Sequence, residues 1–226
     1  MTEIYSRISI QVGLSGFSFK ILADGQTQTS GWMGAETVFT VPQIQRRYSD
    51  VEVSVFSPLC TLVPLDFYVP ENARQMLADV VQLPDNATVG CVEVPEYRAV
   101  MLYSNSTGGT LSKVISESVL RLDGEKSSPL PELYYILRHL ASLKEYNRIV
   151  ASYMDGVLYL AVAQGNTLLL CNTYQAQDFT TAEYYIFLAM KKLQLNPEMS
   201  TICFRTPLNE EQELSLYRYF KSVDII

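Results

Sequence analysis

Apolar residues occupy every second position at 8–12 and again at 17–21. Strict alternation of this kind predicts two half-buried β-strands. Leu14-Ser15-Gly16 turns the chain between them, and Asp24-Gly25 marks the turn that follows. The chain therefore opens with a strand meander.

The same pattern recurs 141 positions later, where Arg148-Ile149 repeats Arg7-Ile8. A strand is predicted at 149–153, Asp155-Gly156 is typical of a hairpin turn, and 157–163 is the returning strand. A further turn at 164–166 leads into a strand at 167–171. A repeat of this length predicts two copies of one fold unit.

After its meander, the second half predicts two helices around a strand at 200–204. Thr180 and Glu183 have the spacing of a capping box, and the run 184–190 is apolar almost all round, which predicts a helix covered on more than one side. Asn209, followed by two glutamates, starts the second helix. The order β-β-β-α-β-α is typical of the opening of a ribonuclease-H-like unit.

The first half predicts more elements than the second. They are a short helix at 41–48, strands at 51–56 and 60–63, a helix from Pro70 to Leu83, a strand pair at 87–94 and 98–104, a loop at 106–110 and a helix at 133–144 after Pro129-Leu130-Pro131. The predicted organisation is α/β, with a first lobe at 1–146 that contains an inserted subdomain at about 65–125, and a second, smaller lobe at 147–226.

Composition adds that the chain is poor in charge. Charged residues make up 18% and hydrophobic residues 48%, with 15 Tyr and 9 Phe. Two interpretations remain open: a large core, or aromatic surface kept for a partner. The net charge of −7 argues against nucleic acid and against an anionic membrane surface, because both attract basic proteins.

The apolar runs and the cysteines predict a cytoplasmic protein. The longest wholly apolar runs have seven residues, too short to span a membrane, and the amino terminus lacks the pattern of a signal peptide. Cys60, Cys91, Cys171 and Cys203 stand apart among strand-like neighbours. Buried, reduced thiols are expected, and neither a disulfide nor a metal site.

Certain residues resemble a family of uncharacterised bacterial proteins with an actin-like ATPase fold. These residues are Leu62-Val63-Pro64, Leu168-Leu169-Leu170 with Asn172-Thr173, and Tyr184-Tyr185 ahead of Leu195-Asn196-Pro197. The resemblance implies two ribonuclease-H-like lobes in tandem. It also implies a likeness to the cytoplasmic actin-like components of type II secretion and type IV pilus assembly, which act chiefly as scaffolds. Arg205-Thr206 departs from the family pattern, which has a glycine there.

The resemblance further implies ATP binding between the lobes, which requires a Gly-containing hairpin and a Mg²⁺-side acid in each lobe. The candidate turn residues are Ser15 and Gly16 in the first lobe, and Asp155 and Gly156 in the second. The acid of the first lobe is expected near Gln11, but neither 8–12 nor 149–153 contains Asp or Glu. Asp155 itself is best explained as a hairpin-turn residue.

The turn against adenosine gives the strongest test, because it needs residues without Cβ. All 11 glycines lie at or before Gly165, so the last lobe offers none after its final predicted strand. Gly108-Gly109 lies in the first half, lacks a P-loop frame and is explained by loop flexibility. ATP hydrolysis of the usual kind is therefore not expected, and no cofactor is predicted.

Other chemistry has no better support. His139 is predicted as a surface or half-buried helix residue, because no motif ties a nucleophile to it. Glu210-Glu211 is explained by the charge preference of a helix start. Trp32, in a glycine-flanked segment, is either a mobile aromatic contact or a packed side chain.

The main hypothesis is a non-catalytic, actin-like cytoplasmic protein that binds a protein partner or itself. The alternatives are a divergent ATP-dependent phosphotransferase, which a Mg-ATP titration would reveal, and a small-molecule sensor that uses the inter-lobe cleft, which a thermal-shift screen would reveal.

Overall fold

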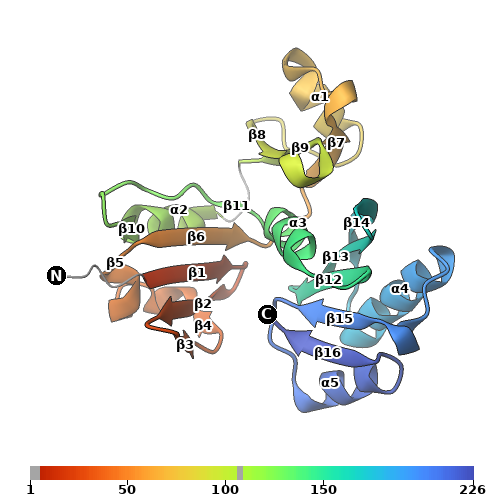
Figure 1. Cartoon of the computed structure of the whole chain (residues 1–226). Coiled ribbons are helices and arrows are strands. Elements are labelled where there is room, and N and C mark those ends of the chain that lie inside the picture. Colours follow the sequence, from red (N-terminus) through yellow and green to blue (C-terminus); the bar gives the residue numbers. More distant parts are fainter. Residues whose placement is uncertain (1–5, 106–108) are drawn as a thin grey trace. The chain divides into compact units, whose positions relative to one another are not determined.

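The computed structural model describes residues 6–105 and 109–226, which fold into two compact units (Figure 1). The first comprises the described parts of 1–57 and 106–132, and the second comprises 58–105 and 133–226. No helix in the described part of the chain is both long and apolar enough to cross a membrane.

The first unit is built on a mixed sheet with the strand order β3-β2-β1-β6-β11. The strands β1, β2 and β3 form an antiparallel meander, whereas β6 and β11 run parallel to β1, and α2 lies along β6 (Figure 1). The main elements are β1 (Ser6–Val12), β2 (Gly16–Ala23), β3 (Gln26–Thr29), β6 (Asp50–Val55), α2 (Gly109–Ser118) and β11 (Leu130–Pro131).

Short elements complete the first unit. They are β4 (Met33–Gly34), which pairs with β2, the 3-10 turns η1 (Ala35–Thr37) and η2 (Pro42–Gln45), and the paired strands β5 (Arg47–Tyr48) and β10 (Leu120–Arg121). One face of the large sheet is apolar, because alternate residues of β1, β2 and β6 point to it. Ile8, Ile10 and Val53 pack there against Ile115 and Val119 at the α2 end.

The second unit repeats this topology. Its five-stranded sheet has the order β14-β13-β12-β15-β16, with an antiparallel meander β12-β13-β14 and the strands β15 and β16 parallel to β12. The elements are α3 (Glu132–Ser142), whose first residue Glu132 belongs to the first unit, β12 (Asn147–Met154), β13 (Val157–Gln164), β14 (Thr167–Gln175), α4 (Phe179–Lys192), η6 (Pro197–Met199), β15 (Thr201–Phe204), α5 (Glu210–Tyr217) and β16 (Ser222–Ile225). The predicted pair of ribonuclease-H-like lobes is confirmed.

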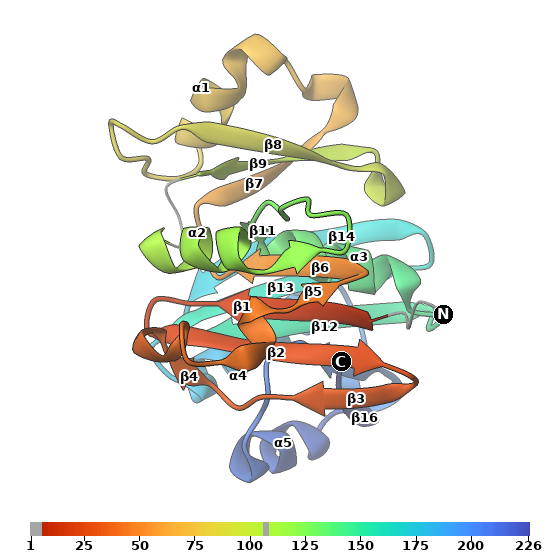
Figure 2. The same cartoon turned by 90° about the vertical axis from the view of Figure 1, so that its left-hand side faces the viewer.

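A separate three-stranded sheet belongs to the second unit, in the order β7-β9-β8. In Figure 2 the helix α1 lies over this sheet, and its Leu77 is buried with Val63, Val100 and Leu102. The elements are β7 (Cys60–Pro64), η3 (Leu65–Phe67), η4 (Pro70–Asn72), α1 (Ala73–Ala78), β8 (Val89–Val94), η5 (Pro95–Tyr97) and β9 (Ala99–Ser104). Compact packing therefore groups 58–105 with the carboxyl-terminal sheet, while the lobe limits 1–146 and 147–226 and the insert at 65–125 stay predictions about the repeated units.

Two predicted helix boundaries and one predicted loop differ from the structure. The N-cap of α4 is Asp178, whose carboxylate accepts from the Thr181 N–H, so the helix begins before the expected Thr180–Glu183 box. The predicted loop at 106–110 is already helical from Gly109, and its other residues 106–108 lie outside the described chain. The helix expected to reach Leu83 ends at Ala78.

No disulfide joins the four cysteines, as expected, but they are not all buried. Cys60 and Cys203 are buried and Cys171 is partly buried, whereas Cys91 is exposed on β8, where the prediction was wrong. In the native protein we therefore expect a maleimide reagent at neutral pH to modify Cys91 first, which mass spectrometry of tryptic peptides would detect.

The hydroxyl group of Tyr97 is buried and has no hydrogen-bond partner among the described residues. Burial raises the pKa of this phenol, and the nearby Arg148 opposes that shift. A buried unpaired hydroxyl costs about 1–3 kcal/mol. We expect Tyr97→Phe to leave the free energy of unfolding unchanged or to raise it by about 1 kcal/mol, as measured by urea unfolding. Tyr146→Phe, at an exposed position, is the matched control, and a clear loss of stability in Tyr97→Phe would contradict the assignment.

Candidate functional site

The second face of the first sheet is polar, which is unusual for buried strands. Residues of β1 stand directly opposite residues of β6 on it: Arg7 faces Asp50, and Gln11 faces Ser54. Gln11 is 8% exposed and Ser54 is 0% exposed, so these side chains are withdrawn from water. Buried polar groups need partners, and the partners differ between the two ends of the strands.

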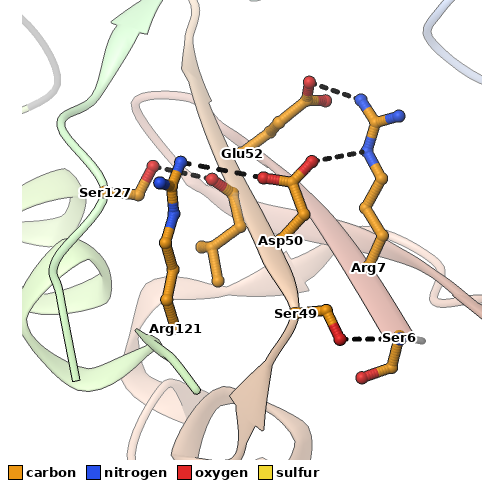
Figure 3. A network of polar contacts seen from close by, with 8 residues as sticks. Ser6, Arg7, Ser49, Asp50, Glu52, Arg121 and Ser127 are labelled. Carbon is orange, nitrogen blue, oxygen red and sulfur yellow. Dashed lines mark hydrogen bonds and ion pairs between the residues drawn. The ribbon is translucent and has the colours of Figure 1, made fainter. Parts of the chain in front are cut away.

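At the amino ends of β1 and β6 the partners form an ion-pair network (Figure 3). Arg7 Nε lies 3.5 Å from Asp50, and Arg121 Nη2 lies 3.7 Å from the other oxygen of the same carboxylate. Arg7 also pairs with Glu52. Ser127 Oγ donates to the carbonyl of Val51 at 2.7 Å, which ties the 121–130 segment to β6. Since every carboxylate faces a guanidinium, this network is suited to joining β1, β6 and β10.

At the carboxyl ends of the same strands lies Glu132, the first residue of α3, with a side chain that is completely buried. Gln11 Nε2 donates to Glu132 Oε1 at 3.1 Å, and Ser54 Oγ donates to Oε2. Both carboxylate oxygens thus accept hydrogen bonds from the polar face. We call Gln11, Ser54 and Glu132 the Glu132 site.

The Glu132 site occupies the position where ligands generally bind in open α/β sheets, at the carboxyl ends of parallel strands. Its chemistry is that of one carboxylate held by an amide and a hydroxyl. No group of three metal-ligating side chains occurs among the described residues, so the site has no ready set of metal ligands. The resemblance implies an acid near Gln11, and the sequence contains none at 8–12. The carboxylate that the structure brings to Gln11 is that of Glu132, 121 positions later, and the Gln11 amide donates to it.

The first candidate turn, with Ser15 and Gly16, is held by the segment that contains Trp32. Trp32 Nε1 donates to Ser15 Oγ at 3.2 Å, and its ring lies 6.4 Å from that of Phe56 between centroids. Trp32 is therefore packed within the first unit, which favours the second of its two interpretations. A Cβ at Gly16 would lie 1.9 Å from the Met33 carbonyl oxygen, so the glycine is required for β2 to pair with β4.

The second candidate turn is a two-residue hairpin between β12 and β13. Asp155 and Gly156 have φ values of 51° and 74°, and Met154 pairs with Val157 around them, which is the geometry of a type I′ turn. The Gly156 carbonyl accepts from the Ala176 N–H at 2.8 Å. The predicted hairpin role of Asp155 is present; a ligand-binding role for Ser15, Gly16, Asp155 or Gly156 stays a prediction.

The turn after β15 is filled by two buried side chains, Arg205 and Thr206, which are 7% and 1% exposed. Thr206 Oγ1 accepts from the Tyr153 N–H at 3.1 Å, and the Arg205 guanidinium lies 5.2 Å from the centroid of the Tyr135 ring. The Arg205 N–H bonds the Ala151 carbonyl at 3.0 Å. This turn is therefore packed by its own side chains against β12 and α3.

The remaining candidates have structural explanations. His139 is half-buried in α3, as expected. Arg148 donates to the carbonyls of Leu140 and Ala141 at 3.2 and 3.3 Å, so its charge caps the carboxyl end of that helix. Glu210 and Glu211 lie in the first turn of α5, after the Asn209–Gln212 capping box. Gly109 begins α2, and Gly108 lies outside the described residues.

Comparisons with known proteins identify both a family and a fold. The model of a family described as "Protein of unknown function (DUF3822)" matches residues 2–223. A crystal structure of a Bacteroides thetaiotaomicron protein, described as having an actin-like ATPase fold and unknown function, is similar with a TM-score of 0.70. It is 17% identical, and the match covers 98% of this chain and 90% of the other.

A second solved structure, a PilM–PilN type IV pilus biogenesis complex, is similar with a TM-score of 0.52 and 13% identity, over 97% of this chain and 88% of the other. A Ppx/GppA family protein of Aquifex aeolicus reaches a TM-score of only 0.37 at 12% identity, over 90% of this chain and 67% of that one. No curated protein matches the sequence. At these identities the first two structures establish the fold alone, which is the actin-like ATPase fold predicted from the sequence.

Proposed function

The chain belongs to the DUF3822 family, whose function is unknown, and from that premise we propose that it is a non-catalytic cytoplasmic protein that acts by binding another protein. Its fold is the actin-like ATPase fold. In the proposed role the fold has lost its nucleotide site and serves as a scaffold, with no cofactor and no metal.

The observation that carries the proposal is the packed turn after β15. An actin-like nucleotide site needs residues without Cβ at this turn, so that the backbone can lie against the adenosine. Here Thr206 and Arg205 are both buried, and the Thr206 hydroxyl is bonded to the backbone of β12. A nucleotide at this position would have to displace side chains that already contact the core.

The strand ends support the same proposal. Where a Mg²⁺-side carboxylate is expected on β1, Gln11 contributes a neutral amide that donates to Glu132. The strand β12, Asn147–Met154, likewise contains no Asp or Glu. Both features lower the affinity expected for a magnesium-bound triphosphate.

Exposed aromatic side chains support a role in protein binding. Aromatic residues are enriched in the buried centres of protein interfaces, where they contribute a large share of the affinity. The solved PilM–PilN complex offers an example in which a protein of similar fold is bound to another protein. The aromatic residues with about half or more of their surface exposed are Phe39, Phe67, Tyr146, Tyr184, Tyr217 and Tyr219.

Two measurements test the proposal. Light scattering on the purified protein, together with affinity capture from native extract, should find self-association or a specific partner. Calorimetric titration with Mg-ATP should give no heat of binding. A strictly monomeric protein without a specific partner would contradict the binding role, and micromolar affinity for Mg-ATP, about −8 kcal/mol, would contradict the loss of the nucleotide site.

The second candidate function is a divergent ATP-dependent phosphotransferase, and the Glu132 site favours it. Glu132 places one buried carboxylate at the carboxyl ends of β1 and β6, where an acidic group could act on a ligand. If the titration shows Mg-ATP binding, Glu132→Gln should then be compared with the parent. Loss of turnover with binding retained would support this candidate over the scaffold.

A further inference from the structure

The segment 58–105 carries much of the negative charge of the chain. It contains six carboxylates and two arginines, so it holds −4 of the net −7 in 48 of the 226 residues. Its two arginines are already engaged: Arg74 donates to the carbonyls of Pro84, Asp85 and Ala87, and Arg98 lies 3.5 Å from Asp66. The acids that are exposed and have no ion-pair partner among the described residues are Glu71, Asp79, Asp85, Glu93 and Glu96.

Within this segment an apolar strip faces solvent. Leu65, Phe67 and Val69 are 48%, 73% and 43% exposed, although they lie between a sheet and a helix. Only the neighbouring Tyr68 turns inward, against the core that contains Leu77. The Leu65 N–H donates to the Arg98 carbonyl at 2.8 Å, which holds the strip beside the β8–β9 connection. Two acids adjoin these residues: Glu71 follows them in the chain, and Glu96 lies in η5, which precedes Arg98. We call Leu65, Phe67, Val69, Glu71 and Glu96 the acidic strip.

A patch of the opposite charge lies on the same unit, where α4 and α5 end. The rings of Phe187 and Tyr219 are 4.8 Å apart, which brings the two helix ends together, and Lys191 lies one turn beyond Phe187 on α4. The Lys221 N–H bonds the Pro197 carbonyl at 3.2 Å, which adds η6 to the group. We call the exposed residues Lys191, Lys192, Met199, Tyr217, Arg218, Tyr219 and Lys221 the basic patch.

The basic patch is the counterpart of the acidic strip in charge and in chemistry. None of its four cations has an ion-pair partner among the described residues, and Glu198 is the one acid in η6 beside it. Each surface thus combines unpaired charge of one sign with exposed apolar or aromatic side chains. Complementary potentials direct association and fix its orientation, while the apolar side chains supply the area that is removed from water.

The two surfaces lie toward opposite edges of the five-stranded sheet. Cys60 of β7 and Tyr97 of η5 both lie near Cys171 of β14, at one edge, and Tyr97 also lies near Arg148 of β12. The basic patch adjoins β16, at the other edge, through the Tyr217 hydroxyl, which donates to the Val223 carbonyl at 3.0 Å. The acidic strip of one molecule is therefore available to the basic patch of another.

We infer that a second copy of this chain is a partner, and that its basic patch docks on the acidic strip in a head-to-tail contact. The inference rests on the proposed binding function and specifies its partner. Because the two surfaces differ, the contact is heterologous, so a dimer still has one free strip on one copy and one free patch on the other. Association therefore continues beyond the dimer, to rings or open chains.

The first test follows the mass of the full-length protein with concentration and salt. Sedimentation velocity at micromolar to sub-millimolar concentration should show species larger than a dimer at low salt. Raising the ionic strength from 0.05 to 0.5 M should weaken association by about tenfold or more, because the distance over which exposed charges interact falls from about 14 Å to about 4 Å. A monomer at every concentration, or association that ignores salt, would overturn the inference.

The second test uses one variant on each surface. Phe67→Ser removes the apolar centre of the strip without changing its charge, and Lys191→Glu with Arg218→Glu reverses the charge of the patch; each should weaken self-association by about tenfold or more. All three positions are exposed, so folding, checked by circular dichroism, should be retained. Phe39→Ser and Lys113→Glu with Lys126→Glu are matched controls at exposed positions of the first unit and should associate like the parent.

Mixing the two variants gives the sharpest result. The strip variant keeps its patch and the patch variant keeps its strip, so a mixture should form a 1:1 dimer that cannot extend. If the mixture stays monomeric while the controls associate, the head-to-tail contact is wrong. If all forms are monomeric but native extract yields a specific partner, the inference fails and the proposed function survives; monomers with no partner would reject both.

Discussion

Replacing Glu132 with alanine is expected to lower the free energy of unfolding by about 2–4 kcal/mol. The substitution leaves the Gln11 amide and the Ser54 hydroxyl without the acceptor that they now bond, in a place that is closed to water. Each buried donor that loses its partner costs about 1–3 kcal/mol. Denaturant unfolding monitored by circular dichroism would measure the loss.

Three further variants separate the hydrogen bonds from the volume of the side chain. Glu132→Gln keeps the shape and one acceptor oxygen, so it should lose less than Glu132→Ala. In a double-mutant cycle, Gln11→Ala should cost much less when Glu132 is already alanine, since the two side chains form one network. Glu117→Ala, at an exposed position of α2, is the matched control. Equal losses for Glu132→Ala and Glu117→Ala would contradict the network.

The strand meanders could be predicted because their signal is local. The strands predicted from alternation at 8–12 and 17–21 correspond to β1 and β2, and the turn predicted at Asp155-Gly156 is the hairpin between β12 and β13. Period-2 alternation and a two-residue turn need only neighbouring residues. The repeat of the meander then led to the tandem lobes, which the identical strand orders of the two sheets confirm.

The errors arose where local signals compete. Asp178 and Thr180 both suit an N-cap, and the structure uses Asp178, whose carboxylate bonds the Thr181 N–H at 2.7 Å. The helix α2 was missed because it starts at a glycine and because Ser112 and Ser116 share its buried face with Ile115. Two polar residues on that face interrupt the apolar period by which a helix is predicted. The short strand β16 was not predicted, since its pairing with β15 becomes apparent only in three dimensions.

The Glu132 site could not be predicted from sequence, because its partners are remote. Gln11 and Ser54 precede Glu132 by 121 and 78 positions. From sequence, an acid in the first turn of a helix is explained by the charge preference of that position. The one available signal was the strand pattern itself. Gln11 and Ser54 are polar residues within two apolar strands, and if they are buried their side chains need a hydrogen-bond partner.

The turn after β15 illustrates what sequence can and cannot state. The absence of glycine beyond Gly165 argued against an adenosine-binding turn. The structure adds how this turn is held, since Thr206 accepts a backbone hydrogen bond and Arg205 packs on Tyr135. These contacts join the turn to the core of the second unit, and they depend on residues that are distant in the sequence.

Alkaline pH is expected to destabilise the protein strongly. Burial raises the pKa of the Cys171 thiol from 9.0 to about 12 and that of Cys203 to about 11, and it also raises the pKa of Cys60. The phenol pKa values of Tyr48, Tyr97, Tyr103 and Tyr153 are raised, for the same principal reason.

The sign follows from which state holds the proton. A thiol is neutral when protonated, and the folded protein retains this proton to higher pH than the unfolded chain does. The stabilisation is therefore fully present below about pH 9 and is lost as the pH rises toward 12, because only the unfolded chain gains by ionisation. For Cys171 alone, the loss by pH 11 amounts to about 2–3 kcal/mol.

Urea unfolding between pH 7 and pH 11.5 measures this loss as a slope. Cys171→Ala should lower stability at neutral pH only modestly but should flatten the alkaline slope, because its thiol no longer titrates. Thr173→Ala, a truncation on the same strand without a titrating group, should keep the slope of the parent. If Cys171→Ala and Thr173→Ala fall in parallel above pH 9, then Cys171 ionises as readily in the folded protein as in the unfolded chain, and β14 is more open to water than its packing indicates.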